Sequence, residues 1–123
     1  MVKIKLVNGT QLKRGLLEFA EEYKFSLCQD ADALEVRAVL ARDGLLTVKG
    51  NLERGISISF PQKIHFFRGF GLFLEKMAEG EKSFDLQEKP QFITNEVMID
   101  TSQGNAVPTV RTVKEFLRRM ALM

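Results

Sequence analysis

The sequence predicts an α+β fold, a two-layer sandwich in which a mostly antiparallel sheet carries two helices on one face. Several short segments alternate apolar and polar residues, which is the pattern of strands with one face in water. Two longer segments repeat apolar residues at helical spacing. The 123 residues are 45% hydrophobic and 28% charged, a composition typical of globular domains that bury a core without disulfides or metal.

The first strand and the first helix are predicted near the amino terminus. Residues 2–6 alternate valine, isoleucine and leucine with two lysines, so we expect a strand there. Thr10, which follows an Asn-Gly pair, is a candidate N-cap. The apolar spacing beyond it predicts a helix of about 14 residues with one buried side. That side contains Leu12, Leu16, Phe19, Ala20 and Tyr23.

Three strands are expected next, arranged as a meander. Residues 34–41 and 45–49 flank Asp43-Gly44, a dipeptide suited to the positive φ angles of a tight hairpin turn. The segment 50–55 has a glycine at each end and turns the chain again, and residues 56–60 alternate large apolar residues with serine. Strands joined by short turns are antiparallel, so this part predicts the mostly antiparallel sheet.

The second helix, predicted from Pro61 onward, carries apolar residues over more than half of its circumference. One face of a sheet can cover only one stripe of a helix. The second stripe therefore predicts another apolar surface, supplied by a partner domain or by the carboxyl-terminal segment. The two stripes consist of Ile64, Phe67, Gly71, Leu74 and Ala78, and of Phe66, Phe70, Phe73 and Met77.

A boundary between two units, 1–89 and 90–123, is predicted after a short edge strand over 83–88. Proline at position 90 restricts the residue before it and cannot donate to a sheet. The second unit consists of a predicted buried strand at 97–99, a loop and a final helix. Thr112 and Glu115 have the spacing of a capping box for that helix. Its apolar stripe comprises Val113, Phe116, Leu117 and Met120.

Composition argues against several function classes. The formal net charge is only +2, whereas binding to nucleic acid through phosphate neutralisation usually requires a basic stripe. Cys28 and His65 are the single residues of their types, which is too few for a disulfide or a four-ligand zinc site. The sequence has neither a visible signal peptide nor an apolar run near the roughly 18 residues of a membrane span. We therefore expect a cytoplasmic protein without metal, cofactor, nucleic-acid or membrane partner.

Catalytic candidates are few, and each has a simpler structural explanation. Glu21-Glu22 lies on the wet side of the first predicted helix. A helical histidine beside two phenylalanines, such as His65, is more often a packed residue than a general base. Cys28 has no adjacent cation to activate its thiol. The glycines of Arg68-Gly69-Phe70-Gly71 lie inside a helical pattern, where they favour close approach of helix and sheet over a phosphate cradle.

Two segments of the second unit are candidate binding sites. The polar loop at 100–105 follows a predicted buried strand at its carboxyl end, where parallel α/β and barrel folds gather ligand-binding groups. Turn formation explains these polar residues equally well. A basic group in the last helix either binds nucleic acid or complements the helix dipole. This group consists of Arg111, Lys114, Arg118 and Arg119.

Three segments resemble the amino-terminal part of glycoside hydrolase family 20, the β-N-acetylhexosaminidases. They are KIHFFRGFGLFLEKM at 63–77, PQFITNEVMID at 90–100 and VKEFLRRMALM at 113–123. In that family a small α/β domain, with helices on one side of a sheet, precedes a (β/α)8 barrel. The resemblance implies that 1–89 is this accessory domain and that 90–123 is the first strand and helix of a barrel truncated after Met123.

The same resemblance implies substrate-binding roles for Asp100 and Gln103. Gln103 stands where the family has an arginine that hydrogen-bonds sugar hydroxyls, and Asp100 begins the corresponding Asp-x-Ser-Arg type sequence. An amide lacks the charge and the planar fork of a guanidinium, so sugar recognition at this corner is expected to differ. The family's catalytic Asp-Glu pair lies on a later strand, and these 123 residues contain no Asp-Glu dipeptide.

The first hypothesis is therefore a non-catalytic amino-terminal fragment of a hexosaminidase-like glycosidase, whose partner is the remainder of the barrel. Carbohydrate would be the substrate of the parent enzyme only, through the retaining, substrate-assisted mechanism of the family. The alternative is a complete α+β module that binds another protein. If the apolar stripe of the last helix has lost its barrel partners, residues 90–123 must fold back on the domain, exchange between chains or stay unpacked. Self-association of the isolated chain through this helix is one of these expected outcomes.

Overall fold

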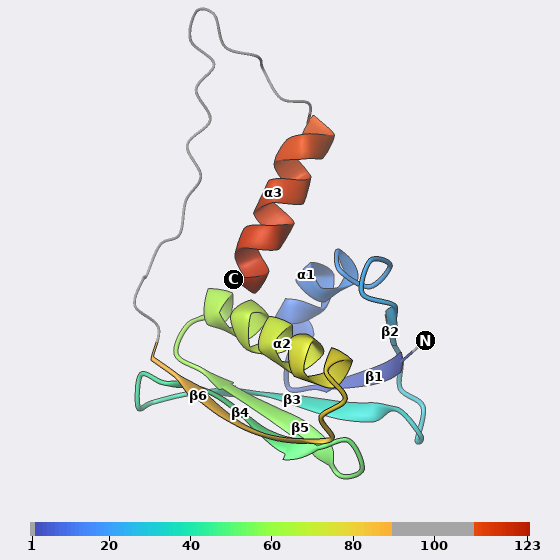
Figure 1. The fold of residues 1–123 in the computed structure, drawn as a ribbon, viewed down its shortest axis with the longest axis vertical. Helices are drawn as coiled ribbons and strands as arrows, with labels where there is room; N and C mark the ends of the chain where they lie inside the picture. Colours follow the sequence, from blue (N-terminus) through green and yellow to red (C-terminus); the bar gives the residue numbers. More distant parts are fainter. Residues whose placement is uncertain (1, 90–109) are drawn as a thin grey trace, which may run out of the picture.

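A six-stranded sheet forms one layer of the protein, and the helices lie on one side of it (Figure 1). The computed structural model describes residues 2–89 and 110–123. The strands are β1 (Val2–Val7), β2 (Phe25–Leu27), β3 (Leu34–Leu40), β4 (Leu46–Asn51), β5 (Gly55–Phe60) and β6 (Ser83–Glu88). The helices are α1 (Lys13–Leu17), which follows a 3-10 turn at Thr10–Leu12, α2 (Lys63–Ala78) and α3 (Val110–Leu122). The predicted α+β class is confirmed.

The sheet is mixed, so the prediction of a mostly antiparallel sheet is wrong. The strand order is β2-β1-β3-β5-β4-β6. β1 is parallel to β2 and to β3, and β3 is parallel to β5, whereas β4 is antiparallel to both β5 and β6. The connections through α1 and α2 each cross over one face and return the chain to the same end of the sheet, which makes the strands they join run in the same direction.

The predicted meander is also wrong, because β5 lies between β3 and β4. The connection at 41–45 does contain a turn residue, Gly44 with φ +74°. That connection nevertheless spans the roughly 9.6 Å that separate second-neighbour strands in a sheet. The second predicted turn, at 50–55, is confirmed: a tight hairpin joins β4 to β5. Asn51 Oδ1 accepts hydrogen bonds there from the N–H groups two and three residues later.

The first helix is shorter than its apolar spacing predicts, since α1 spans only five residues. Thr10 is not its N-cap: the 3-10 turn begins at Thr10, with Gly9 before it and no side-chain cap hydrogen bond. Lys24, with φ +56°, reverses the chain into β2, a strand that the periodicity does not predict. Phe19 and Phe25, on either side of this reversal, are both in the core at 3% and 2% exposure.

The core lies between the sheet and the helices α1 and α2. Two elements agree with the sequence prediction. Helix α2 spans residues 63–78, and β6 is the edge strand expected over 83–88. Buried phenylalanines of α2 pack edge-on against buried rings of the strands, and each such ring contributes on the order of 2–3 kcal/mol through burial. The pairs are Phe70 with Phe25 (5.2 Å between centroids), Phe66 with Phe60 (5.6 Å) and Phe73 with Phe84 (5.3 Å).

The final helix is present as predicted, but it begins at Val110. Thr112 therefore lies inside the helix, and the predicted capping box of Thr112 and Glu115 is wrong. The predicted strand at 97–99 and the polar loop at 100–105 lie outside the described residues.

Candidate functional site

The carboxyl-terminal end of α3 packs against α2 (Figure 1). Gly71 makes this approach possible, because a Cβ added there would lie 2.8 Å from the carbonyl oxygen of Leu122. Arg68 Nη1 donates to the same carbonyl at 3.4 Å. Its Nε and Nη2 donate to the carboxylate of Glu88 at 3.2 and 3.3 Å. The guanidinium complements the negative end of the α3 dipole. The carboxyl-terminal segment thus covers part of the apolar stripe of α2 that contains Gly71.

The remainder of α3 leaves an apolar surface in solvent. None of its residues is buried. Val113 and Met120 of the predicted stripe are half-buried, whereas Phe116 is 48% exposed and Leu117 is 58% exposed. An exposed aromatic and aliphatic pair on an amphipathic helix is typical of a contact surface for another element.

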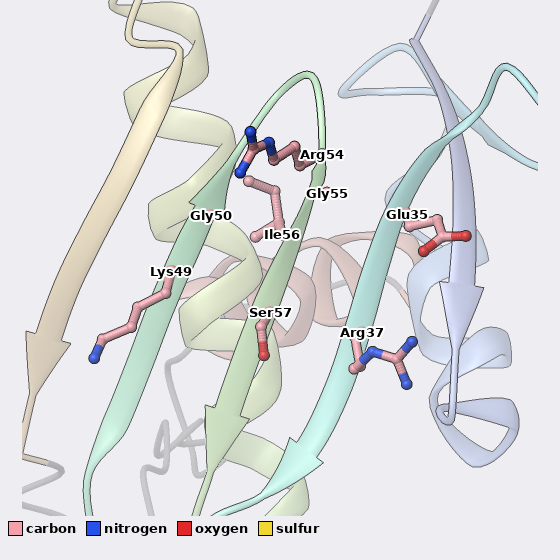
Figure 2. Close-up of a pocket in the computed structure, with 8 residues that line it drawn as sticks. All are labelled: Glu35, Arg37, Lys49, Gly50, Arg54, Gly55, Ile56 and Ser57. Carbon is pink, nitrogen blue, oxygen red and sulfur yellow. The ribbon is translucent and has the colours of Figure 1, made fainter.

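The other face of the sheet carries an open depression of about 430 Å³. It is not covered by any helix in the described part of the chain (Figures 1 and 2). Its floor and walls come from β3, from β4, from β5 and from the turn between the last two strands. The lining residues are Glu35, Arg37, Lys49, Gly50, Arg54, Gly55, Ile56 and Ser57.

Strand register places Arg37 and Lys49 on either side of Ser57. Ser57 is the partner of Arg37 across the β3–β5 ladder and of Lys49 across the β4–β5 ladder. Residues directly opposite each other share one face of a sheet. Figure 2 shows both long side chains extending outward from Ser57, with Arg54 over the end of the depression near the hairpin turn.

Two glycines line the hairpin end of the depression. Gly50 has φ +131° and Gly55 has φ +114°, in a region of backbone conformation that glycine adopts without strain. A Cβ added to Gly50 would overlap the carbonyl oxygen of Gly55, and one added to Gly55 would lie 3.1 Å from the carbonyl oxygen of Glu35. The close approach of the strands here therefore excludes side chains.

The depression has a positive electrostatic balance. Its charged lining is three cations and one carboxylate, and all four side chains are exposed. The carboxylate, Glu35, lies 3.9 Å from Nζ of Lys5, which is outside the depression. Within residues 2–89 and 110–123, no ion pair is formed by Arg37, Lys49 or Arg54.

The residues singled out from the sequence do not gather at this depression. Asp100 and Gln103 lie outside the described residues. His65 is half-buried on α2, and its backbone N–H donates to the carbonyl of Gln62 at 2.9 Å. Cys28 is half-buried just after β2, and its backbone N–H donates to the carbonyl of Ile4 at 2.9 Å, which extends the β1–β2 ladder.

The charged candidates are surface groups. Glu21 and Glu22 are exposed, as predicted. Arg118 Nη2 lies 3.0 Å from Oε2 of Glu18 on the α1 side, and Arg111 Nε lies 3.6 Å from Oε1 of Glu115. These pairs offset part of the positive charge of the basic group, which weakens the case for phosphate contacts along α3.

Sequence reasoning missed the depression because its cations come from two separate strands and from a turn. Alternation alone assigns Arg37, Lys49 and Ser57 to the wet face of their strands. Their proximity depends on β5 lying between β3 and β4, which the predicted meander did not contain. The one available signal was the glycine at each end of 50–55, which marks a close backbone approach.

Residues 2–89 and 110–123 contain neither a candidate metal-binding group nor a membrane-spanning helix. No group of three or more His, Cys, Asp or Glu side chains there could hold a metal ion. None of the helices in these residues is long and apolar enough to cross a membrane. Comparison of the chain with known proteins identifies no family: no family model matches it, and no curated protein is similar to it.

Proposed function

We propose that this chain is the amino-terminal part of a β-N-acetylhexosaminidase-like glycoside hydrolase, with 1–89 as a non-catalytic accessory domain and 90–123 as the first strand and helix of its barrel. The observation that carries the proposal is the exposed apolar side of α3, where Phe116 and Leu117 lie in solvent. Helices of a (β/α)8 barrel bury one side against the strands and neighbouring helices.

The accessory domain has a mechanical role in this proposal. α2 is fixed to the sheet by its buried phenylalanines, and Arg68 connects α2, β6 and the end of α3 through Glu88 and Leu122. These contacts give α3, the proposed first helix of the barrel, a fixed position on the accessory domain. The position of the helices on one side of the sheet supports the likeness to the small α/β domain that precedes the barrel in this family.

The chemistry of the parent enzyme is proposed from the resemblance of the sequence. A glutamate acts as general acid, an aspartate orients the acetamido group, and the acetamido oxygen of the substrate attacks the anomeric carbon. These two carboxylates belong to a later barrel strand in this proposal. Asp100 and Gln103 contact the sugar at the end of the first strand.

The test compares the 123-residue chain with the product of the same reading frame extended beyond Met123. We expect the extended protein to hydrolyse 4-nitrophenyl N-acetyl-β-glucosaminide and the 123-residue chain to release no nitrophenol. A substrate with hydroxyl in place of the acetamido group should not be cleaved, since it lacks the internal nucleophile. Hydrolysis by the 123-residue chain itself would overturn the proposal.

A reading frame that ends directly after Met123 would also overturn it. The exposed side of α3 would then belong to the alternative function, a small α+β module that binds another protein. Pull-down of a defined partner by the wild-type chain, but not by a Leu117→Glu variant, would support that alternative.

A further inference from the structure

We propose that the depression on the open face of the sheet binds a small ligand that carries a phosphate dianion. Arg37, Lys49 and Arg54 supply the positive charge, and the hydroxyl of Ser57 supplies a neutral donor on the floor. This site lies on the face of the sheet opposite α2 and α3, so it is independent of the proposed contact with a barrel.

The net charge of the lining favours a ligand with two negative charges. Three cations and one carboxylate line the depression, and Glu35 also faces Lys5 at 3.9 Å. The lining therefore keeps a surplus of positive charge, which a phosphate monoester with about −1.5 to −2 charges near neutral pH would offset. Guanidinium groups bind phosphate oxygens through paired N–H donors, and lysine contributes a point charge.

Geometry allows these groups to converge on one anion. Arg37 and Lys49 flank Ser57 in a single cross-strand row, so their Cα atoms are separated by two strand spacings, roughly 9.6 Å. Both side chains are exposed and extend away from Ser57 (Figure 2). They can rotate toward the space above the serine without displacing any core residue.

The size of the depression favours a small molecule over a bare ion. Its volume of about 430 Å³ lies within the roughly 300–1,000 Å³ of small-molecule sites. Gly50 and Gly55 line its hairpin end, beside Arg54, without side chains. A phosphorylated compound the size of a monosaccharide fits this space, with its phosphate over Ser57.

The test is a titration of the ¹⁵N-labelled 123-residue chain with inorganic phosphate, glucose 6-phosphate and neutral glucose, in buffer of about 20 mM ionic strength. We expect saturable shifts of the Gly50, Gly55 and Ser57 amide signals with both phosphates and none with glucose. Equal shifts with glucose, or shifts that never saturate with phosphate, would overturn the proposal.

Variants locate the binding and separate it from net charge. We expect Arg37→Gln and Lys49→Gln each to weaken phosphate binding about threefold, and the double variant about tenfold, because each removes one close Coulombic partner. The control is Arg42→Gln, which removes an exposed arginine from the 41–45 turn outside the depression and should leave the affinity within about twofold of wild type.

If Arg42→Gln weakened phosphate binding as much as Arg37→Gln does, the proposed site would be overturned, because the effect would then come from the overall charge of the protein. The substituted side chains are exposed, and preserved amide dispersion in each spectrum establishes that the variants are folded. Arg37→Lys should bind more weakly than wild type and more tightly than Arg37→Gln, because lysine keeps the charge and loses the paired donors.

Discussion

At the scale of single residues, Gly69 and Gly71 of α2 serve two different contacts. A Cβ on Gly69 would lie 2.8 Å from Cγ2 of Ile58 and 3.0 Å from Cδ1 of Leu46, both buried in the sheet. A Cβ on Gly71 would meet the backbone of Leu122 in α3. The predicted role of these glycines in close helix–sheet packing is thus confirmed for Gly69, whereas Gly71 admits another helix.

The two alanine variants should differ in how strongly they destabilise the fold. Gly69→Ala overpacks the core, at a cost of about 1–3 kcal/mol, which exceeds the gain of about 1 kcal/mol from helix propensity. Gly71→Ala gains the same propensity and displaces only α3. We expect a lower melting temperature for Gly69→Ala alone, and faster proteolysis of α3 in Gly71→Ala. Equal destabilisation by both would contradict this division.

Lys3 gives a pH-dependent prediction. Its hydrogen bond to Asp30 and the charge of Asp32 raise the pKa of the Lys3 ammonium above 10.5. A raised pKa in the folded state stabilises the fold below the unfolded value, and this contribution disappears as pH rises through the folded value. Lys3→Gln should therefore lower the urea midpoint slightly at about pH 8, and by less at about pH 11.5.

The control for that variant is Lys63→Gln, since Lys63 is exposed and forms no ion pair within the described residues. Its urea midpoint should follow wild type at both pH values. A difference between Lys3→Gln and wild type that persists undiminished at high pH would assign the effect to packing of the lysine stem.

At the scale of elements, α3 contributes little to the core of the sheet domain. Ala121 and Leu122 are its residues that pack, half-buried, against the core. The remaining core comes from the strands, from α2, and from the segment 10–20 that contains α1. The predicted boundary at 89 stays a prediction. The limited burial of α3 against the rest of the protein is compatible with it.

Truncation after Lys89 tests that boundary. Partial burial of one leucine and one alanine contributes about 1–2 kcal/mol, so the shortened chain should unfold cooperatively at a melting temperature only a few degrees below that of the full chain. Circular dichroism melts of both chains measure this. Loss of cooperative unfolding in the truncated chain would show that 1–89 is not an independent unit.

At the scale of the whole molecule, the two sides of the sheet have opposite character. The helical side ends in the exposed apolar residues of α3, and the open side presents the cationic depression. Apolar surface that no element covers favours association between copies of a chain. The isolated protein is therefore expected to bury Phe116 and Leu117 in contacts between molecules.

Light scattering over a concentration series checks this expectation. The mean mass of the wild-type chain should rise with concentration, and Leu117→Glu should suppress the rise by placing a charge on the contact. Leu40→Glu is the matched control, because Leu40 is 68% exposed on β3 rather than on α3. A strict monomer at all concentrations, or equal suppression by both variants, would contradict association through α3.

The sequence by itself determined the class of the fold, the long second helix and the edge strand at 83–88, because periodicity reports which side of an element is buried. The order of strands was decided only in the tertiary structure. With β5 between β3 and β4, Ile56, Ile58 and Phe60 are buried in the core, a non-local arrangement that local turn signals do not encode. The same arrangement places Arg37 and Lys49 around Ser57, so the cationic depression exists only once the sheet has formed.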